Sequence, residues 1–181
     1  MSRHTSHAWL PSTSRLLIRS FNPAWRRSGT ALRNVTLSLL GRSPLRWNPV
    51  ARLERQAALV GRAREALARV GLEHLAERPL SQTSYGERRR VEIAMALAQD
   101  PRILLLDEPF AGLSIEERRD VLRLVGGIPR EVTIVMIEHD MDVALDFAER
   151  ITVLHFGQVV VEGTRSEVVA HPRTREIYLG E

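Results

Sequence analysis

The sequence predicts an α/β fold built around a parallel sheet, and two features carry this prediction. Two runs of consecutive apolar residues, 103–106 and 133–137, are too short for helices and are typical of buried strands. Each run is followed by polar residues and then by a segment with the composition of a helix. Strands and helices that alternate in this way form parallel sheets. The length of 181 residues and the 44% hydrophobic content favour a single domain.

The charge of the chain is unevenly distributed. Residues 1–50 contain eight arginines and no acid, while residues 51–181 contain 18 arginines and all 22 acidic residues. All 26 basic residues are arginine, so chemistry that requires a lysine must come from elsewhere. The absence of cysteine excludes a disulfide framework, a thiolate metal site and a cysteine nucleophile. No apolar run approaches the roughly 20 residues that span a bilayer, which predicts a soluble or peripheral protein.

The first element, residues 1–18, is expected to be an irregular basic head. It is rich in serine and arginine and shows no sustained hydrophobic period. Its composition also suits a transit peptide, a membrane surface or nucleic acid. The lack of an amphipathic helix and of a long basic run favours a plain irregular tail.

Helices are predicted to follow the head. A short helix is expected over residues 30–40, and a longer one over 51–70, where Ala, Leu, Arg and Glu are abundant and Gly71 serves as the residue after the C-cap. A third helix is expected over 84–99, with the arginines at 88–90 on its solvated face. The remaining predicted elements are the strand 103–106, the helix 114–125, the strand 133–137, the helix 141–149, a hairpin over 151–162, and helices at 166–170 and 173–179.

Polar side chains follow both predicted strands. Asp107 and Glu108 end the first strand, and Glu138 and His139 follow the second. The carboxyl ends of parallel strands meet at one rim, where open α/β sheets bind ligands. An Asp-Glu pair after a buried strand is a pattern in which the Asp serves Mg²⁺ and the Glu serves a water beside a nucleotide phosphate. The simpler alternative is a core strand that ends in a charged turn, with His139 as an edge residue.

Two helix starts contain capping boxes. Ser84 with Glu87, and Ser114 with Glu117, have the spacing in which each side chain bonds the other residue's backbone N–H. This local interpretation requires no ligand. The alternative at the first start is that the serine hydroxyl, the free N–H groups and Gly86 together bind an anion such as phosphate.

In combination these motifs resemble the nucleotide-binding subunits of ABC transporters. Residues 83–87 resemble the signature motif, 103–108 the Walker B strand, 111–114 the D-loop and His139 the switch histidine. The order and the separations match, and the resemblance covers about residues 18–181. It implies a partial P-loop NTPase (ABC ATPase) core with a parallel sheet and a helical signature subdomain.

The resemblance also implies roles for individual residues, with ATP and Mg²⁺ as cofactors. Asp107 would serve Mg²⁺, Glu108 would polarise the attacking water, and His139 would contact the γ-phosphate. The positions that the resemblance assigns to the nucleotide are Asn22, Ser84, Tyr85, Gly86, Glu87, Asp107 and Gly112.

The region before the helices departs from the family pattern. Residues 19–22 resemble the approach to the Q-loop, with Asn22 where glutamine is usual, and Asn22 would serve both the nucleotide and Mg²⁺. The family's P-loop, GxxxxGK[ST], should precede it, but no such motif and no lysine is present. The chain is therefore expected to be the signature-bearing and C-terminal part of a cassette, which resembles a transport ATPase but lacks the P-loop lysine and is not expected to hydrolyse ATP alone.

The domain organisation expected from the resemblance is the head, 1–18, and a partial ATPase domain, 19–181. Within that domain the Q-loop region comes first, the helical subdomain covers about 30–100, and the Walker B part covers 101–181. The C-terminal half resembles the branched-chain amino acid and urea importer type, through the segments 98–101, 137–141, 153–157 and 176–180.

The predicted function is that of an ATP-binding subunit that couples ATP to import of branched-chain amino acids or a related solute. Its expected partners are a second ABC ATPase subunit, in a homo- or heterodimer, and transmembrane permease subunits, at the cytoplasmic face of the bacterial inner membrane. Urea or amide import is an alternative cargo. A non-catalytic interaction or regulatory remnant is an alternative of another class. Nucleic acid is not an expected partner, because the excess of positive charge is confined to the head.

Overall fold

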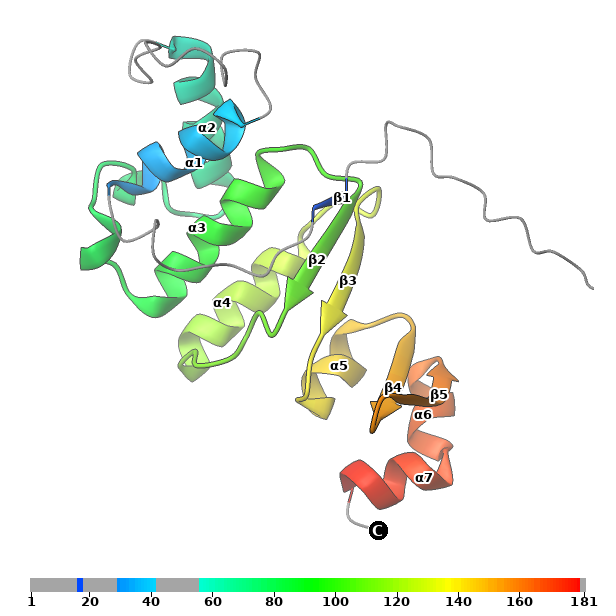
Figure 1. The fold of residues 1–181 in the computed structure, drawn as a ribbon. Helices are drawn as coiled ribbons and strands as arrows, with labels where there is room; N and C mark the ends of the chain where they lie inside the picture. The colour runs from blue at the N-terminus through cyan, green and yellow to red at the C-terminus, as the bar shows by residue number, and fades with distance from the viewer. Residues whose placement is uncertain (1–15, 18–28, 42–55, 180–181) are drawn as a thin grey trace, which may run out of the picture. The chain divides into compact units, whose positions relative to one another are not determined.

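The computed structural model describes residues 16–17, 29–41 and 56–179. It confirms the predicted α/β class, with helices and a parallel strand pair (Figure 1). The chain divides into two compact units, Met1–Met136 and Ile137–Glu181, which we describe separately.

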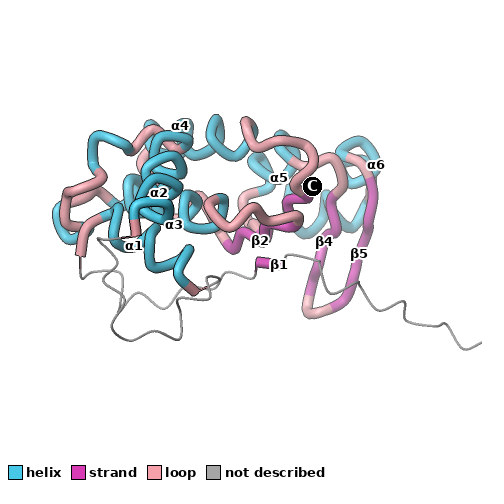
Figure 2. The backbone as a smooth tube through the Cα atoms, turned by 90° about the horizontal axis from the view of Figure 1, so that it is seen from above, coloured by secondary structure: helices cyan, strands magenta, loops and turns pink. Residues whose placement is uncertain are grey.

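Three helices form the helical part of the first unit: α1 (Ala31–Leu40), α2 (Ala57–Arg69) and α3 (Tyr85–Leu97). Two short 3₁₀ turns, η3 (Glu73–Leu75) and η4 (Leu80–Gln82), connect α2 to α3. The helices gather beside the strands of this unit in both views (Figures 1 and 2). They enclose one apolar core whose largest fully buried members are Val35, Leu67, Leu72, Leu75 and Val91.

The predicted helices 30–40 and 84–99 agree with these bounds to within two residues. Gly71 follows α2 with a φ of +70°, as expected for the residue after a C-cap. This helix begins at Ala57, with Gln56 as its N-cap, so the prediction that it starts at residue 51 is wrong, and residues 51–55 lie outside the described residues.

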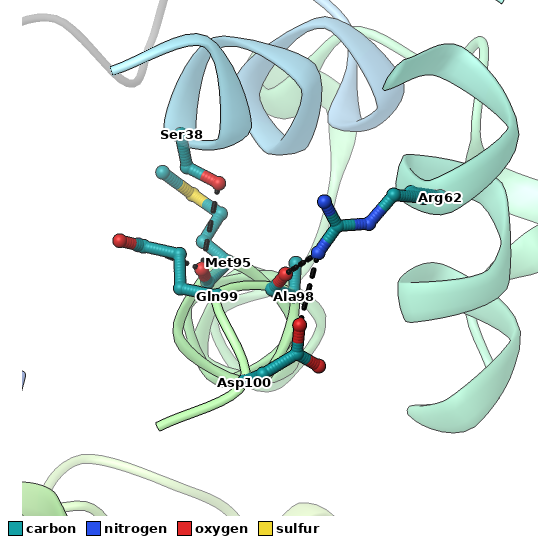
Figure 3. Close-up of polar contacts among 6 residues, drawn as sticks. All are labelled: Ser38, Arg62, Met95, Ala98, Gln99 and Asp100. Carbon is teal, nitrogen blue, oxygen red and sulfur yellow. Dashed lines mark hydrogen bonds and ion pairs between the residues drawn. The ribbon is translucent and has the colours of Figure 1, made fainter. Parts of the chain in front are cut away.

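Side chains from α1 and α2 hold the C-terminal end of α3 (Figure 3). Arg62 of α2 donates a hydrogen bond to the carbonyl of Ala98 at 3.0 Å and pairs with the carboxylate of Asp100 at 3.0 Å. Ser38 of α1 donates to the carbonyl of Met95 at 3.4 Å. The last carbonyls of a helix lack partners within the helix and carry partial negative charge. The guanidinium of Arg62 gives the Ala98 carbonyl a hydrogen-bond donor and places a positive charge at this end of α3. It thereby connects α3 to α2.

The sheet of the first unit has the order β1 (Leu16–Leu17), β2 (Ile103–Asp107) and β3 (Thr133–Ile137). β1 pairs in parallel with β2, with Leu16 opposite Ile103. This corrects the prediction that residues 1–18 are irregular throughout. A two-residue strand is too short to show a hydrophobic period, and its pairing partner lies far away in the sequence.

The two predicted strands differ in burial. Leu104 and Leu106 of β2 are buried, as predicted. In β3, however, Val135 is 48% exposed and Ile137 is 64% exposed, so the prediction of a buried strand is wrong there. β3 is the last strand of the described sheet, so its free edge has no described neighbour to cover it.

The first unit also contains α4 (Ile115–Gly126). The second unit is built from α5 (Met141–Phe147), the hairpin of β4 (Ile151–His155) and β5 (Gln158–Gly163), α6 (Arg165–Ala170), α7 (Pro172–Thr174) and a π-helical turn (Arg175–Leu179). The hairpin is antiparallel and Gly157 lies in its turn with a φ of +75°, as predicted. Val153 and Val168 lie in the small apolar core of the second unit. No helix in the described part of the chain is long and apolar enough to cross a membrane.

The helical core yields a first prediction. Leu67 has no exposed surface, so Leu67→Ala should lower the free energy of unfolding by roughly 2–5 kcal/mol through lost burial and a residual cavity. Leu37 on α1 is 37% exposed, and Leu37→Ala should cost less than about 1 kcal/mol. Urea unfolding of both variants checks this. Equal destabilisation by the two substitutions would show that the helical core is not packed as described.

Candidate functional site

The start of α3, which was predicted to be a signature motif, is closed by a capping box. The hydroxyl of Ser84 accepts a hydrogen bond from the N–H of Glu87 at 3.1 Å. The carboxylate of Glu87 accepts from the N–H of Ser84 at 2.7 Å. The local, structural interpretation of this serine and glutamate is therefore confirmed.

A second carboxylate, that of Glu117 on α4, occupies the same helix start. Its Oε1 accepts a hydrogen bond from the hydroxyl of Ser84 at 2.8 Å and from the N–H of Gly86 at 3.0 Å. Its Oε2 accepts from the N–H of Ser114, the N-cap of α4, at 3.1 Å. One anionic group thus bridges the starts of two helices. The free N–H groups and the positive end of a helix dipole both favour an anion in this position.

These contacts lower the pKa of Glu117 below its ordinary value of 4.5. The hydrogen bond from the Ser84 hydroxyl contributes most, followed by the backbone N–H groups of Ser114 and Gly86, and burial opposes the shift. Sequence reasoning found only the capping box of α4 for this glutamate. The contact with Ser84 spans 33 residues and leaves no local pattern by which it could have been found.

Two predicted nucleotide-binding glycines lie against side chains of the site. A Cβ added to Gly86 would come within 2.6 Å of the Glu117 carboxyl carbon, so the glycine permits this close approach. Gly112, in the predicted D-loop, has a φ of +71°, and a Cβ added there would lie 3.5 Å from the ring of Tyr85. The structure therefore brings Tyr85 and Gly112 together at the start of α3, where Ser84 is the N-cap.

The end of β2 places the predicted Walker B carboxylates at the surface. Asp107 closes the strand and Glu108 follows it, and both residues are exposed. Glu108 has a φ of +43°, in the left-handed region that costs a non-glycine residue energy. The next residues, Pro109 and Phe110, are buried, and the N–H of Ala111 closes the turn on the Glu108 carbonyl at 3.2 Å.

Arg89 of α3 contacts this turn, which sequence reasoning missed. Its Nε donates to the Pro109 carbonyl at 3.0 Å, and its Nη2 donates to the carbonyls of Asp107, at 3.3 Å, and Glu108. Its Nη1 pairs with Glu92 at 3.0 Å. The side chain is 21% exposed, so the prediction that the arginines of this helix are solvated is wrong for Arg89. Backbone carbonyls are invisible in a sequence pattern, which is why this role could not be predicted.

For two predicted site residues, a place in this region stays a prediction. Asn22 lies outside the described residues. His139 belongs to the second unit, so its approach to Glu108 stays a prediction. Across the described ranges no three histidine, aspartate or glutamate side chains gather to hold a metal. Of the two predicted Mg²⁺ ligands only Asp107 is placed, and its exposed position at the strand end suits a metal that takes its other ligands from phosphate and water.

The lowered pKa of Glu117 gives a second prediction. The ionised carboxylate stabilises the fold fully above the unfolded value of 4.5, and this contribution is lost as the pH falls through the lower folded pKa. Glu117→Gln should therefore be less stable than the parent near neutral pH and should lose less stability on acidification. Urea unfolding across this pH range checks it, with Glu116→Gln, an exposed neighbour, as control. Parallel pH profiles for the parent and Glu117→Gln would contradict the bridging contact.

Comparison with known proteins identifies the family of this chain. The ABC transporter family model matches residues 15–111. The methionine import ATP-binding protein MetN of Bordetella pertussis (strain Tohama I) is 42% identical over 160 residues, which cover 87% of this chain and 41% of MetN. The lipopolysaccharide export system ATP-binding protein LptB of Acidithiobacillus ferridurans is 38% identical, over 88% of this chain and 62% of LptB. The chain thus spans about two fifths to three fifths of the length of these curated relatives.

The solved structures agree. An ATP-binding cassette of an ABC transporter, in its ADP conformation, superposes with a TM-score of 0.71 and 29% identity, over 88% of this chain and 66% of that chain. The family model begins one residue before β1 and ends in the turn after β2, so it spans α1, α2, α3 and the Walker B strand. On these grounds the chain belongs to the ABC transporter family, as a member with the fold of its ATP-binding domain.

Proposed function

We propose that this chain provides the signature and Walker B parts of an ATP-binding subunit of an ABC importer, which couples ATP binding and hydrolysis to solute uptake. ATP and Mg²⁺ are the proposed ligands. A second ABC ATPase subunit and transmembrane permease subunits are the proposed partners, at the cytoplasmic face of the bacterial inner membrane. Family membership and the order of the motifs support the proposal.

The observation that carries the proposal is the anion held at the start of α3. The Ser84 hydroxyl and the Gly86 N–H both donate to one carboxylate, at 2.8 and 3.0 Å. The same two donors at the same helix start suit a phosphate oxygen. In the family that the chain resembles, the signature of one subunit caps the ATP held by the P-loop of the other. We propose this role for Ser84, Tyr85, Gly86 and Glu87.

Glu117 sets a condition on this proposal. Its carboxylate now uses the Ser84 hydroxyl and the Gly86 N–H, and two anions cannot share these donors without strong repulsion. A phosphate from a partner's ATP must therefore displace Glu117. The side chain is flexible and half-buried, so it can turn away while the Ser84–Glu87 capping box stays closed.

The catalytic roles are proposed by resemblance. Asp107 would serve Mg²⁺, with Asn22 as a further ligand, and Glu108 would polarise the attacking water. His139 would contact the γ-phosphate, and Gly112 would lie beside the nucleotide. The exposure of both carboxylates at the end of β2 supports their availability to a ligand.

The cargo is the part of the prediction that the relatives do not support. The predicted cargo was branched-chain amino acids, or urea or amides, whereas the curated relatives are named for methionine import and lipopolysaccharide export. We therefore propose solute import, which the methionine importer supports through the higher identity, and assign no particular solute.

Replacement of Ser84 tests the capping of ATP. Ser84→Ala should abolish ATP-dependent association with an ABC ATP-binding subunit that carries its own P-loop. The matched control is Thr164→Ala, which also opens a capping box but lies on α6, outside all the nucleotide motifs. Each substitution costs roughly 1 kcal/mol of stability. Sedimentation with and without ATP measures the association, and equal ATP-dependent association of both variants would leave only the structural role of Ser84.

ATP hydrolysis by the chain alone tests where the phosphates are held. Phosphoryl transfer depends on positioning and on neutralising phosphate charge, which a P-loop lysine and its backbone cradle provide in this family. These 181 residues contain no lysine, and an arginine fork cannot reproduce a compact ammonium group. We expect phosphate release by the chain to equal that of Glu108→Gln, and to rise only with the P-loop-bearing subunit added. Glu108-dependent turnover by the chain alone would contradict this arrangement, whereas turnover that ignores Glu108 in the mixture would favour the non-catalytic alternative.

A further inference from the structure

The turn that carries the proposed catalytic carboxylate holds an unfavourable backbone conformation. Glu108 is exposed, and it holds a left-handed φ of +43° that an ordinary residue avoids. A strained conformation of this kind persists only where its surroundings enforce it. The buried rings of Pro109 and Phe110 anchor the chain after Glu108, and the N–H of Ala111 donates to the Glu108 carbonyl.

The guanidinium of Arg89 holds the carbonyls of this turn. It donates to three consecutive carbonyls, those of Asp107, Glu108 and Pro109. Two of these bonds are oriented by the planar fork, since Nε and Nη2 point in the same direction. The third arm, Nη1, is held by the carboxylate of Glu92, which lies one turn further along α3 and is only 15% exposed. The ion pair with Glu92 thereby fixes the orientation of the Arg89 guanidinium relative to α3.

We propose that Arg89 is a positioning residue, which sets the backbone of Glu108 and couples it to the helix that bears the signature. Arg89 lies five residues after Ser84 on the same helix, so a displacement of the signature start moves the guanidinium and the three carbonyls with it. The inference rests on the proposed function in one respect, namely that Glu108 acts on the water. The coupling itself does not depend on that role.

The charge of Arg89 suits this task better than a neutral donor would. Carbonyls at the end of a strand accept charge-assisted hydrogen bonds, which are about twice as strong as neutral ones. Lysine carries the same charge but only one nitrogen, so it cannot contact three carbonyls in a fixed geometry. Arg89→Lys therefore separates the effect of charge from the effect of the fork.

Amide hydrogen exchange on the chain alone tests the coupling. The reporter is the N–H of Ala111, which is bonded to the Glu108 carbonyl at 3.2 Å. The reference is the N–H of Leu72, bonded to the Leu67 carbonyl in the helical core at 2.8 Å. We expect Arg89→Lys to accelerate exchange at Ala111 by about tenfold relative to Leu72. Arg64→Lys is the matched control, because Arg64 on α2 makes an exposed ion pair with Glu77, and its replacement should change neither amide.

The outcomes separate a local role from a general one. If Ala111 and Leu72 accelerate together, or if neither responds, Arg89 does not position the turn and the proposal is overturned. Arg89→Ala is a second variant that removes the whole guanidinium group. If it fails to fold, the double variant Arg89→Ala with Glu92→Ala is used, because it also removes the carboxylate that pairs with Arg89. The exchange of the same two amides is compared in each variant.

A second arm connects the coupling to catalysis. In a mixture with a P-loop-bearing subunit that hydrolyses ATP, Arg89→Lys should lower kcat by about tenfold or more while the KM for ATP stays within about twofold. A rise in KM at constant kcat would overturn the positioning role. If no such mixture hydrolyses ATP, the proposed function fails, and the exchange result alone then decides whether Arg89 positions Glu108.

Discussion

The first unit depends on the way α3 is fixed along its length. Its C-terminal carbonyls are held by Arg62 of α2, its middle is tied through Arg89 to the end of β2, and its start is bridged by Glu117 to the start of α4. In all three contacts a charged side chain forms hydrogen bonds with backbone groups. The apolar core places the helix, but it is non-directional. These polar contacts set the rotation and the register of α3, and therefore where Ser84 and Glu108 point.

The proposed function requires two states of the helix start, with different chemistry. With Glu117 in place, the start is satisfied internally and α3 and α4 share one carboxylate. With a phosphate in its place, the same donors would be used by a ligand from another subunit. Since Glu117 also closes the capping box of α4, its release affects the segment between Glu108 and α4. The proposed exchange of anions is thus linked to the turn that Arg89 holds.

The parts that could be predicted from the sequence are those with a local signature. The helices, both main strands, the hairpin with Gly157 and the capping boxes follow from periodicity and turn chemistry, and four linked motifs indicated the family. The parts that could not be predicted depend on pairing over long distances. β1 has only two residues and exists because it pairs with β2, and Val135 is exposed because it lies on the less buried face of β3, whose residues alternate between exposed and half-buried. Arg89 and Glu117 act through backbone groups that no residue pattern encodes.

The central claim is that the start of α3 caps a nucleotide held by another subunit. Photo-crosslinking with an ATP analogue that carries a reactive group on the γ-phosphate tests this directly, with mass spectrometry to locate the label. We expect label on residues 84–88 of this chain when a P-loop-bearing subunit is present, and loss of this label when the P-loop lysine of that subunit is replaced. Label on these residues at equal yield without the other subunit, or label confined to the other subunit, would contradict the claim.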